Sequence, residues 1–353
     1  MKKFLYKTAV FVVPFLLIFL LSFKYYTDTK GDLLRLGFIA DIYNYDFNKV
    51  FKKEMARKIN YTVFSELNLK KQNNFTVFAI GDSFSAQGAA GYQNYLANNS
   101  AIKVLHYDRF LHENPIETVT GFLNGNVLDN IKVDYIILQS VERVFVERAL
   151  VFNKKIKITN DSLTTLIKKH KEKLREVVKE KTKDKFFSRE ILRFSLNTIC
   201  YNFDDNAYLS TVYQVKTKKK LFSTNNHNLL FYTEDYEFLK TNNDVKKINI
   251  LNNELNTLAK RLKNKGIKLI VLPCPDKLDF YYDEIISKDK YAKPIFFDCL
   301  KNLNKEYIYI DAKKVLQEKA KNKKDVYFYD DTHWSPIAAK IIGSKLDEII
   351  NTK

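Results

Sequence analysis

The chain has 353 residues and a formal net charge of +18. This length suffices for one large α/β domain with an insertion or for two smaller domains. The sequence has no nucleic-acid-binding motif, so we expect the charge to face anionic lipid or an anionic glycan and expect no nucleic-acid partner. Three cysteines at positions 200, 274 and 299, an odd number without metal-ligand spacing, exclude a disulfide-built framework. Cys274 and Cys299 could still pair, although a free thiol is common at an apolar strand end.

Residues 1–24 have the pattern of an export signal or a membrane anchor. A lysine-containing start precedes an uncharged apolar run from Thr8 to Phe23, which ends at Lys24. The run is slightly short for a membrane span, but the tyrosines and lysines beside it suit a membrane interface. No obvious cleavage site follows, so we expect a retained single-pass anchor in the inner (cytoplasmic) membrane and a periplasmic catalytic domain. A cleaved signal peptide is the alternative.

Residues 25–74 are too apolar for a disordered stalk, and we expect a lead-in that packs on the domain. The apolar run Phe75 to Ile80 then predicts a strand, and the stretch Ala86 to Ala97 is compatible with a helix. Between them lies Gly81-Asp82-Ser83-Phe84-Ser85. In a strand, turn and helix of this kind, Ser83 is in the position of a nucleophile, with backbone N–H groups of the helix start nearby. The alternative is an ordinary helix-capping serine.

The segment Val133 to Ser140 predicts a strand buried on both faces. Glu142 and Arg143 follow its carboxyl end, where open α/β sheets place ligand-binding groups. Arg143 could bind a developing oxyanion or an anionic sugar, with Glu142 holding it in place. A structural ion pair is the equally weighted alternative.

Residues 151–245 interrupt the alternation of strands and helices, and we expect an insertion over the active-site face. The alternation resumes in residues 246–353. Five predicted strands, at residues 75–80, 102–107, 133–140, 267–273 and 307–310, predict a three-layer αβα sandwich with a parallel, flavodoxin-like sheet. Residues 75–150 would form its first half and residues 246–353 its second half.

The last segment before the final predicted helix contains Asp330-Asp331-Thr332-His333-Trp334. Residues two apart in an extended segment point the same way, so Asp331 could orient His333 for proton transfer from Ser83. Asp330, three residues before the histidine, is the alternative acid. The five histidines lack paired spacing, so we expect no metal site and no cofactor.

Together, Gly81-Asp82-Ser83-Phe84-Ser85 and Asp331-Thr332-His333-Trp334 resemble the SGNH (GDSL-type) hydrolase superfamily. Within it they resemble the AlgX/AlgJ-like branch of polysaccharide O-acetyltransferases. In the alginate enzymes the histidine block precedes the serine block, whereas here the order is that of ordinary SGNH esterases. The resemblance implies an SGNH fold and a Ser83–His333–Asp331 triad.

The resemblance also implies an oxyanion hole built from the serine N–H, a glycine N–H and an asparagine side chain. Gly121, Asn124 and Asn126 are the candidates, and no spacing selects among them. A glycine-broken surface helix is the alternative interpretation. The implied partners are an exported or cell-surface polysaccharide and a membrane-bound O-acyltransferase that delivers the acyl donor.

Three functions follow from these patterns. The first is a membrane-anchored O-acyltransferase, with acetyl as the expected group, that modifies a polysaccharide through an acyl-enzyme. The second is a carbohydrate esterase with the same triad, because only water exclusion decides between the two reactions. The third is a non-catalytic glycan-binding scaffold, which the intact Ser83, His333 and Asp331 disfavour.

Overall fold

The computed structural model describes residues 1–28, 31–43, 45–56, 58–69, 71–99, 101–179, 189–208, 210–224 and 226–352. A six-stranded parallel sheet forms its centre, with the strand order β1-β3-β2-β4-β7-β8. Without the edge strand β1, the order is that of a flavodoxin-like sheet. The strands are β1 (Thr62–Val63), β2 (Asn73–Ile80), β3 (Val104–His106), β4 (Ile131–Val141), β7 (Lys268–Cys274) and β8 (Ile308–Tyr309).

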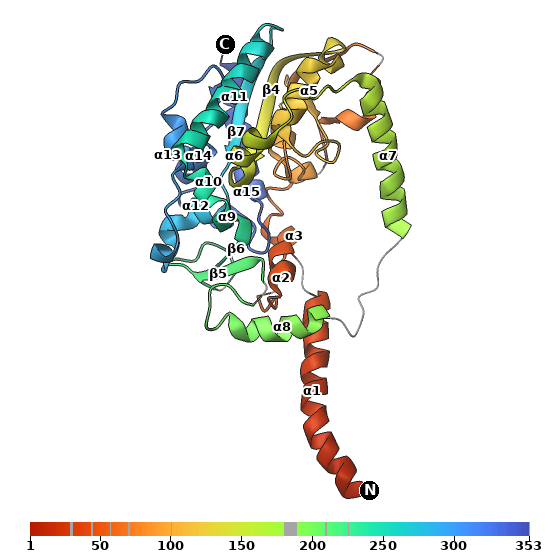
Figure 1. The fold of residues 1–353 in the computed structure, drawn as a ribbon, viewed down its shortest axis with the longest axis vertical. Coiled ribbons are helices and arrows are strands. Elements are labelled where there is room, and N and C mark those ends of the chain that lie inside the picture. Colours follow the sequence, from red (N-terminus) through yellow and green to blue (C-terminus); the bar gives the residue numbers. More distant parts are fainter. Residues whose placement is uncertain are drawn as a thin grey trace.

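Helices cover both faces of this sheet (Figure 1). Alternate strand residues point to opposite faces, so Val77 and Ile137 belong to one hydrophobic core and Phe78 and Ile136 to the other. The first face carries α4 (Tyr92–Ala97), α14 (Ala312–Lys319) and α15 (Pro336–Asn351), and the second carries α5 (Pro115–Asn124), α6 (Glu142–Val151), α11 (Val245–Lys263) and α13 (Phe296–Lys301). The predicted three-layer α/β fold is confirmed.

The two halves of the sheet differ in how closely they follow the predicted elements. The strand and helix bounds after residue 245 agree with the sequence to within a few residues. The predicted helix from Ala86 to Ala97 is shorter, because Gly88 has a positive φ of 56° and α4 begins only after Gly91. The edge strand β1 comes from the lead-in and was not predicted.

Three further groups of elements lie outside the central sheet. The lead-in contributes α2 (Asp32–Gly37) and α3 (Phe47–Val50). A separate antiparallel pair consists of β5 (Val212–Lys216) and β6 (Asn228–Tyr232). The remaining helices are α7 (Asn160–Lys179), α8 (Arg189–Cys200), α9 (Thr233–Glu237), α10 (Leu239–Asn242) and α12 (Lys277–Tyr281).

The helix α1 (Lys2–Asp28) projects away from the rest of the chain, and α8 lies across its inner end (Figure 1). Most of its apolar side chains are exposed. By length and composition, residues Lys2–Tyr26 could cross a membrane. A signal sequence has the same features. The chain thus has one exposed N-terminal apolar helix of the signal or anchor type.

Candidate active site

The serine turn follows β2 at the carboxyl edge of the sheet. Strand β2 ends at Ile80, and Ser83 lies three residues later, partly exposed. Gly81 is required here by close packing, because a Cβ at this position would lie 2.3 Å from both Gln139 Oε1 and Ser85 Oγ. The glycine therefore lets the chain turn tightly over β4.

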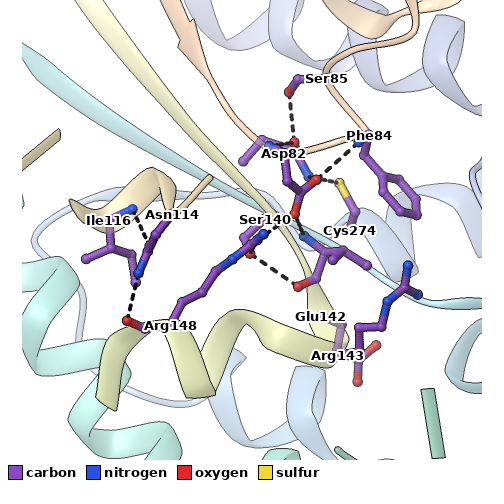
Figure 2. Close-up of polar contacts among 12 residues, drawn as sticks. Asp82, Phe84, Ser85, Asn114, Ile116, Ser140, Glu142, Arg143, Arg148 and Cys274 are labelled. Carbon is purple, nitrogen blue, oxygen red and sulfur yellow. Dashed lines mark hydrogen bonds and ion pairs between the residues drawn. The ribbon is translucent and has the colours of Figure 1, made fainter. Parts of the chain in front are cut away.

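The side chain of Asp82 fixes the turn from below (Figure 2). Its carboxylate accepts hydrogen bonds from the backbone N–H groups of Phe84 at 3.1 Å and Val141 at 2.7 Å. It also accepts them from Gln139 Nε2 at 2.9 Å and Arg148 Nη1 at 2.6 Å. Burial alone would raise the pKa of Asp82, but Arg148 and these donors hold it below its ordinary value. Asp82 is therefore a structural anion that sets the position of the serine.

The histidine segment is a closed loop rather than a simple extended strand. Tyr327 and Trp334 form an isolated antiparallel bridge, and the Phe328 N–H donates to the His333 carbonyl at 3.1 Å. Within this loop, His333 Nδ1 lies 2.6 Å from Asp331 Oδ1, and the same oxygen accepts a hydrogen bond from the His333 N–H at 3.0 Å. Burial alone would raise the pKa of Asp331, but the hydrogen bonds and charge of His333 lower it. Asp331 is thus an ionised partner that fixes the ring of His333.

Asp330, the alternative acid, has another environment. Its carboxyl group packs against Gly31 of the lead-in, where a Cβ would lie 2.4 Å from Asp330 Oδ2. Its carbonyl accepts a hydrogen bond from the Leu33 N–H at 2.9 Å. Burial raises the pKa of Asp330 to about 7. The side chain therefore joins the histidine loop to the lead-in instead of contacting the imidazole.

Lys277 supports the same loop from inside the protein. Its buried ammonium group donates to the carbonyls of Phe328, Tyr329 and Asp331 at 2.9 to 3.1 Å. Burial lowers the pKa of Lys277 to about 7. This lysine at the start of α12 is a positioning residue for Asp331.

Direct contacts join the serine turn to the histidine loop. Gln87 Nε2 donates to the Trp334 carbonyl at 2.9 Å, and Trp334 Nε1 donates to Gln87 Oε1 at 3.0 Å. The ring of Phe84 lies 4.9 Å from that of His333, centroid to centroid. These contacts hold together two segments that are far apart in the chain, since Gln87 and Trp334 are separated by 247 residues.

Ser83, Asp331 and His333 line one cavity of about 320 Å³. Nε2 of His333, the nitrogen that does not face Asp331, is buried and has no hydrogen-bond partner in the part of the chain that the structure describes. A buried imidazole nitrogen without a partner is expected where a hydroxyl group or a substrate completes the site. The other residues lining the cavity are Phe47, Ala86, Gln87, Ala90, Arg109, Phe110 and Phe328.

Arg109 is a further site residue that the sequence analysis missed. It follows β3 at the same sheet edge, and its guanidinium carbon lies 4.4 Å from the centroid of the Phe110 ring. Nε of Arg109 is buried without a partner among the described residues. Phe110 stacks on His170 of α7, so this helix borders the cavity. Its position just after a predicted strand is the feature of the sequence that could have identified Arg109 as a site residue.

Arg143 does not line this cavity. Its Nη1 lies 2.5 Å from Asp235 Oδ1, and its Nε lies 3.8 Å from a carboxylate oxygen of Glu234. Both carboxylates belong to α9, so the ion pair joins α6 to α9. The neighbouring Glu142 is fully buried, and burial together with Asp279 and Asp276 raises its pKa well above its ordinary value. The observed contacts of Arg143 are those of a structural ion pair, the alternative interpretation, and its role in ligand binding stays a prediction.

The oxyanion candidates on α5 also lie away from the serine. Asn124 Nδ2 donates to the carbonyls of Lys154 and Ile156, and its Oδ1 accepts from Arg261 Nη2 at 2.7 Å. Gly121 packs against Ile158. Helix α5 begins near the carboxyl edge of the sheet and runs back toward the start of β4, so its last residues approach the opposite edge. The expectation that Gly121 and Asn124 form the oxyanion hole is therefore corrected, and neither they nor Asn126 line the cavity.

Metal ligands and cysteines form no second reactive centre among the described residues. Within the described ranges, no group of three histidine, cysteine, aspartate or glutamate side chains is placed to hold a metal ion. The three cysteines are free, and Sγ of the buried Cys274 accepts a hydrogen bond from Gln139 Nε2 at 3.3 Å. The proposed chemistry therefore rests on the serine and histidine segments.

Comparison with known families agrees with this geometry for the C-terminal part of the chain. Residues 227–353 match the family model described as SGNH hydrolase-like domain, acetyltransferase AlgX. This stretch contains β6, the second half of the sheet and the Asp331–His333 loop, whereas Ser83 lies outside it. No curated protein matches the chain. Residues 227–353 of this chain are therefore similar to the SGNH hydrolase-like domain described for acetyltransferase AlgX.

Proposed function

We propose that the chain is a membrane-anchored O-acyltransferase that transfers acetyl groups to an exported or cell-surface polysaccharide outside the cytoplasm. The observation that carries this proposal is the shared cavity of Ser83 and His333, with Nδ1 of the histidine held by Asp331 and Nε2 left without a partner. The match of residues 227–353 to an acetyltransferase domain supports the choice of acetyl transfer.

In the first half-reaction, Ser83 Oγ attacks the carbonyl carbon of the acyl donor while His333 Nε2 takes the hydroxyl proton. The resulting imidazolium is stabilised by Asp331. Collapse of the tetrahedral intermediate breaks the bond to the leaving group, which receives the proton from His333. The acetyl group then remains as an ester on Ser83.

The second half-reaction uses the same groups. A sugar hydroxyl gives its proton to His333 Nε2 and attacks the acyl-enzyme, and the returning proton restores Ser83. Phe47, Phe110 and Phe328 line the cavity, and aromatic walls of this kind can stack on a sugar ring and limit the access of water.

Negative charge develops on the acyl oxygen in both steps. We assign its stabilisation to the N–H of Ser83, which lies next to Oγ by covalent geometry, and to the guanidinium group of Arg109. This assignment replaces Gly121 and Asn124. The donor acyl group would arrive from a membrane-bound O-acyltransferase partner, in agreement with one exposed apolar helix at the N-terminus.

The test is a partition experiment with the full chain in detergent, a chromogenic acetyl ester and a series of sugar oligomers. Ester loss and acetyl gain on the oligomer are followed together, with Ser83→Ala as the control. Acetylated oligomer that depends on Ser83 would support the transferase. Ester loss to water alone, across varied acceptors, would instead favour a carbohydrate esterase, the activity associated with this order of motifs.

A further inference from the structure

Helix α8 has apolar side chains on two sides. Ile191 and Phe194 point into the protein and are almost fully buried. On the other side, Leu192, Leu196 and Ile199 are 64%, 46% and 60% exposed, and Phe203 in the following turn is 86% exposed. The spacing of four and three residues places Leu192, Leu196 and Ile199 on one stripe of the helix, and Phe203 continues the exposed apolar series in the turn that follows. We call these four residues the α8 stripe.

An exposed stripe of this kind is unusual on the surface of a soluble domain. Contiguous exposed apolar side chains mark a contact with a partner or a membrane, because water gains no hydrogen bonds from them. The inward residues already supply the packing of α8 on the domain. The α8 stripe therefore requires a separate explanation.

The position of α8 supplies this explanation, because α8 is attached to the inner end of α1 (Figure 1). The hydroxyl groups of Ser22 and Ser195 share a hydrogen bond, and the rings of Tyr26 and Phe194 meet edge to face at 5.8 Å. Tyr26 also stacks on Phe38, and the guanidinium carbon of Arg193 lies 4.1 Å from the centroid of the Phe38 ring. These contacts fall in the last turns of α1, beyond its most apolar part.

If α1 spans the membrane, its C-terminal end, to which α8 is attached, is the part that would emerge from the lipid. Tyrosine and lysine residues, here Lys24, Tyr25 and Tyr26, are typical of the membrane interface. A helix held at that level, with one apolar stripe turned away from the protein, has the pattern of an interfacial helix.

We propose that α8 lies on the outer surface of the membrane with the α8 stripe inserted among the lipids. Together with α1 it would hold the domain by two contacts and so fix the orientation of the sheet relative to the bilayer. This inference rests on the anchoring part of the proposed function and is independent of the chemistry at Ser83.

The test uses fluorescence of the full chain in vesicles of phosphatidylcholine and phosphatidylglycerol. The lipids carry bromine atoms on the acyl chains roughly 5–10 Å below the headgroups, the depth expected for an interfacial apolar face. The protein has one tryptophan, the fully buried Trp334, which serves as the background. Three variants add a reporter: Leu196→Trp on α8, Lys263→Trp on the exposed end of α11, and Leu16→Trp on α1.

We expect brominated lipid to quench the Leu196→Trp reporter several-fold more than the Lys263→Trp reporter. Adding Leu192→Glu and Ile199→Glu to the Leu196→Trp variant should remove most of this quenching without unfolding the domain, because both positions are exposed. Quenching of the Leu16→Trp reporter tests the anchor separately.

Two results would overturn the inference while the anchor stands. One is a Leu196→Trp reporter quenched no more than the Lys263→Trp reporter although Leu16→Trp is quenched. The other is protection of Leu196→Trp from the brominated lipid that grows with protein concentration, which would assign the stripe to a second copy of the chain. An unquenched Leu16→Trp reporter would contradict both the anchor and the interfacial helix.

Discussion

Two sides of the serine turn differ in how their polar groups are paired. Below the turn, Asp82 accepts hydrogen bonds from two backbone N–H groups, Gln139 and Arg148. In the cavity above it, Nε2 of His333 and Nε of Arg109 are buried and, within the described residues, have no partner. A buried polar group left without its hydrogen bond costs about 1–3 kcal/mol. The hydrogen-bonded side of the turn therefore has a structural role. On the cavity side, a bound ligand would supply the missing hydrogen bonds.

The substitution Ser83→Ala should separate the effect on catalysis from the effect on stability most clearly. The change removes the nucleophile but no hydrogen bond of the Asp82 network, so we expect transfer and hydrolysis rates to fall by roughly 10⁴ to 10⁶. The melting temperature should stay the same. Rates from purified full-length protein and a thermal melt measure both effects, and an unchanged rate would favour the non-catalytic scaffold.

A second comparison replaces each of the two neighbouring aspartates in turn by asparagine. Asp331→Asn should lower kcat by about 10⁴, because the amide can no longer hold the imidazole in the required tautomer or stabilise its charge. Asp330→Asn should change kcat only a few-fold, since that carboxyl group faces the lead-in. Steady-state kinetics of the two variants decide the matter, and equal losses would remove Asp331 from its proposed role.

Arg109 and Arg143 provide a matched pair of variants, because Arg109 lines the cavity and Arg143 forms an ion pair away from it. Arg109→Met should lower kcat by about 10² to 10³, the effect of removing one donor to a developing oxyanion, with little loss of stability. Arg143→Met should leave kcat per folded molecule nearly unchanged but destabilise the fold, because Asp235 would remain buried and unpaired. A large loss of kcat in Arg143→Met at full folding would reverse the assignment.

The paired side is tested by Asp82→Asn. Asparagine keeps an acceptor for the backbone but removes the charge facing Arg148, whose side chain is 18% exposed. We expect the free energy of unfolding to fall by about 3 kcal/mol, the lower end of the range for breaking a buried ion pair. Denaturant titration measures the change. A variant with wild-type stability and lost activity would place Asp82 in the chemistry instead.

The smallest effect concerns pH and Asp330. Burial raises the pKa of Asp330 from 3.8 to about 7 in the folded chain. Between about pH 4 and pH 7 the folded state therefore holds a proton that the unfolded chain has lost, so this contribution to stability decreases as pH rises. The melting temperature of the wild type should fall over this range relative to Asp330→Asn. Parallel curves for the two proteins would contradict the raised pKa.

The central fold was accessible from the sequence because its signals are local. The main strands β2, β4 and β7 are largely apolar, and the serine and histidine segments each combine a motif with a strand end or a helix start. The spacing of Asp331 and His333 also predicts their contact. By contrast, the edge strand β1 has only two residues and lies in the lead-in, outside the alternation of strands and helices that marked the equally short β8.

The site residues that the sequence misplaced or missed depend on contacts between distant parts of the chain, which a local pattern does not contain. The direction of α5 across the sheet takes Asn124 away from the serine, although the same sequence also suits a loop at the active edge. Arg143 and its partner Asp235 are 92 residues apart, in different parts of the fold. Arg109 lies in a short connection without periodicity, and only the three-dimensional structure shows that it lines the cavity with Ser83.

The measurement that most directly tests the account is the trapping of an acyl-enzyme. The full chain is mixed with a chromogenic acetyl ester without acceptor, quenched in acid during the initial burst, digested and analysed by mass spectrometry. We predict one acetyl group on the peptide containing Ser83, its loss when a sugar acceptor is added before the quench, and none in Ser83→Ala. Acetylation at another residue, or turnover without any acylated serine, would contradict the proposed role of Ser83.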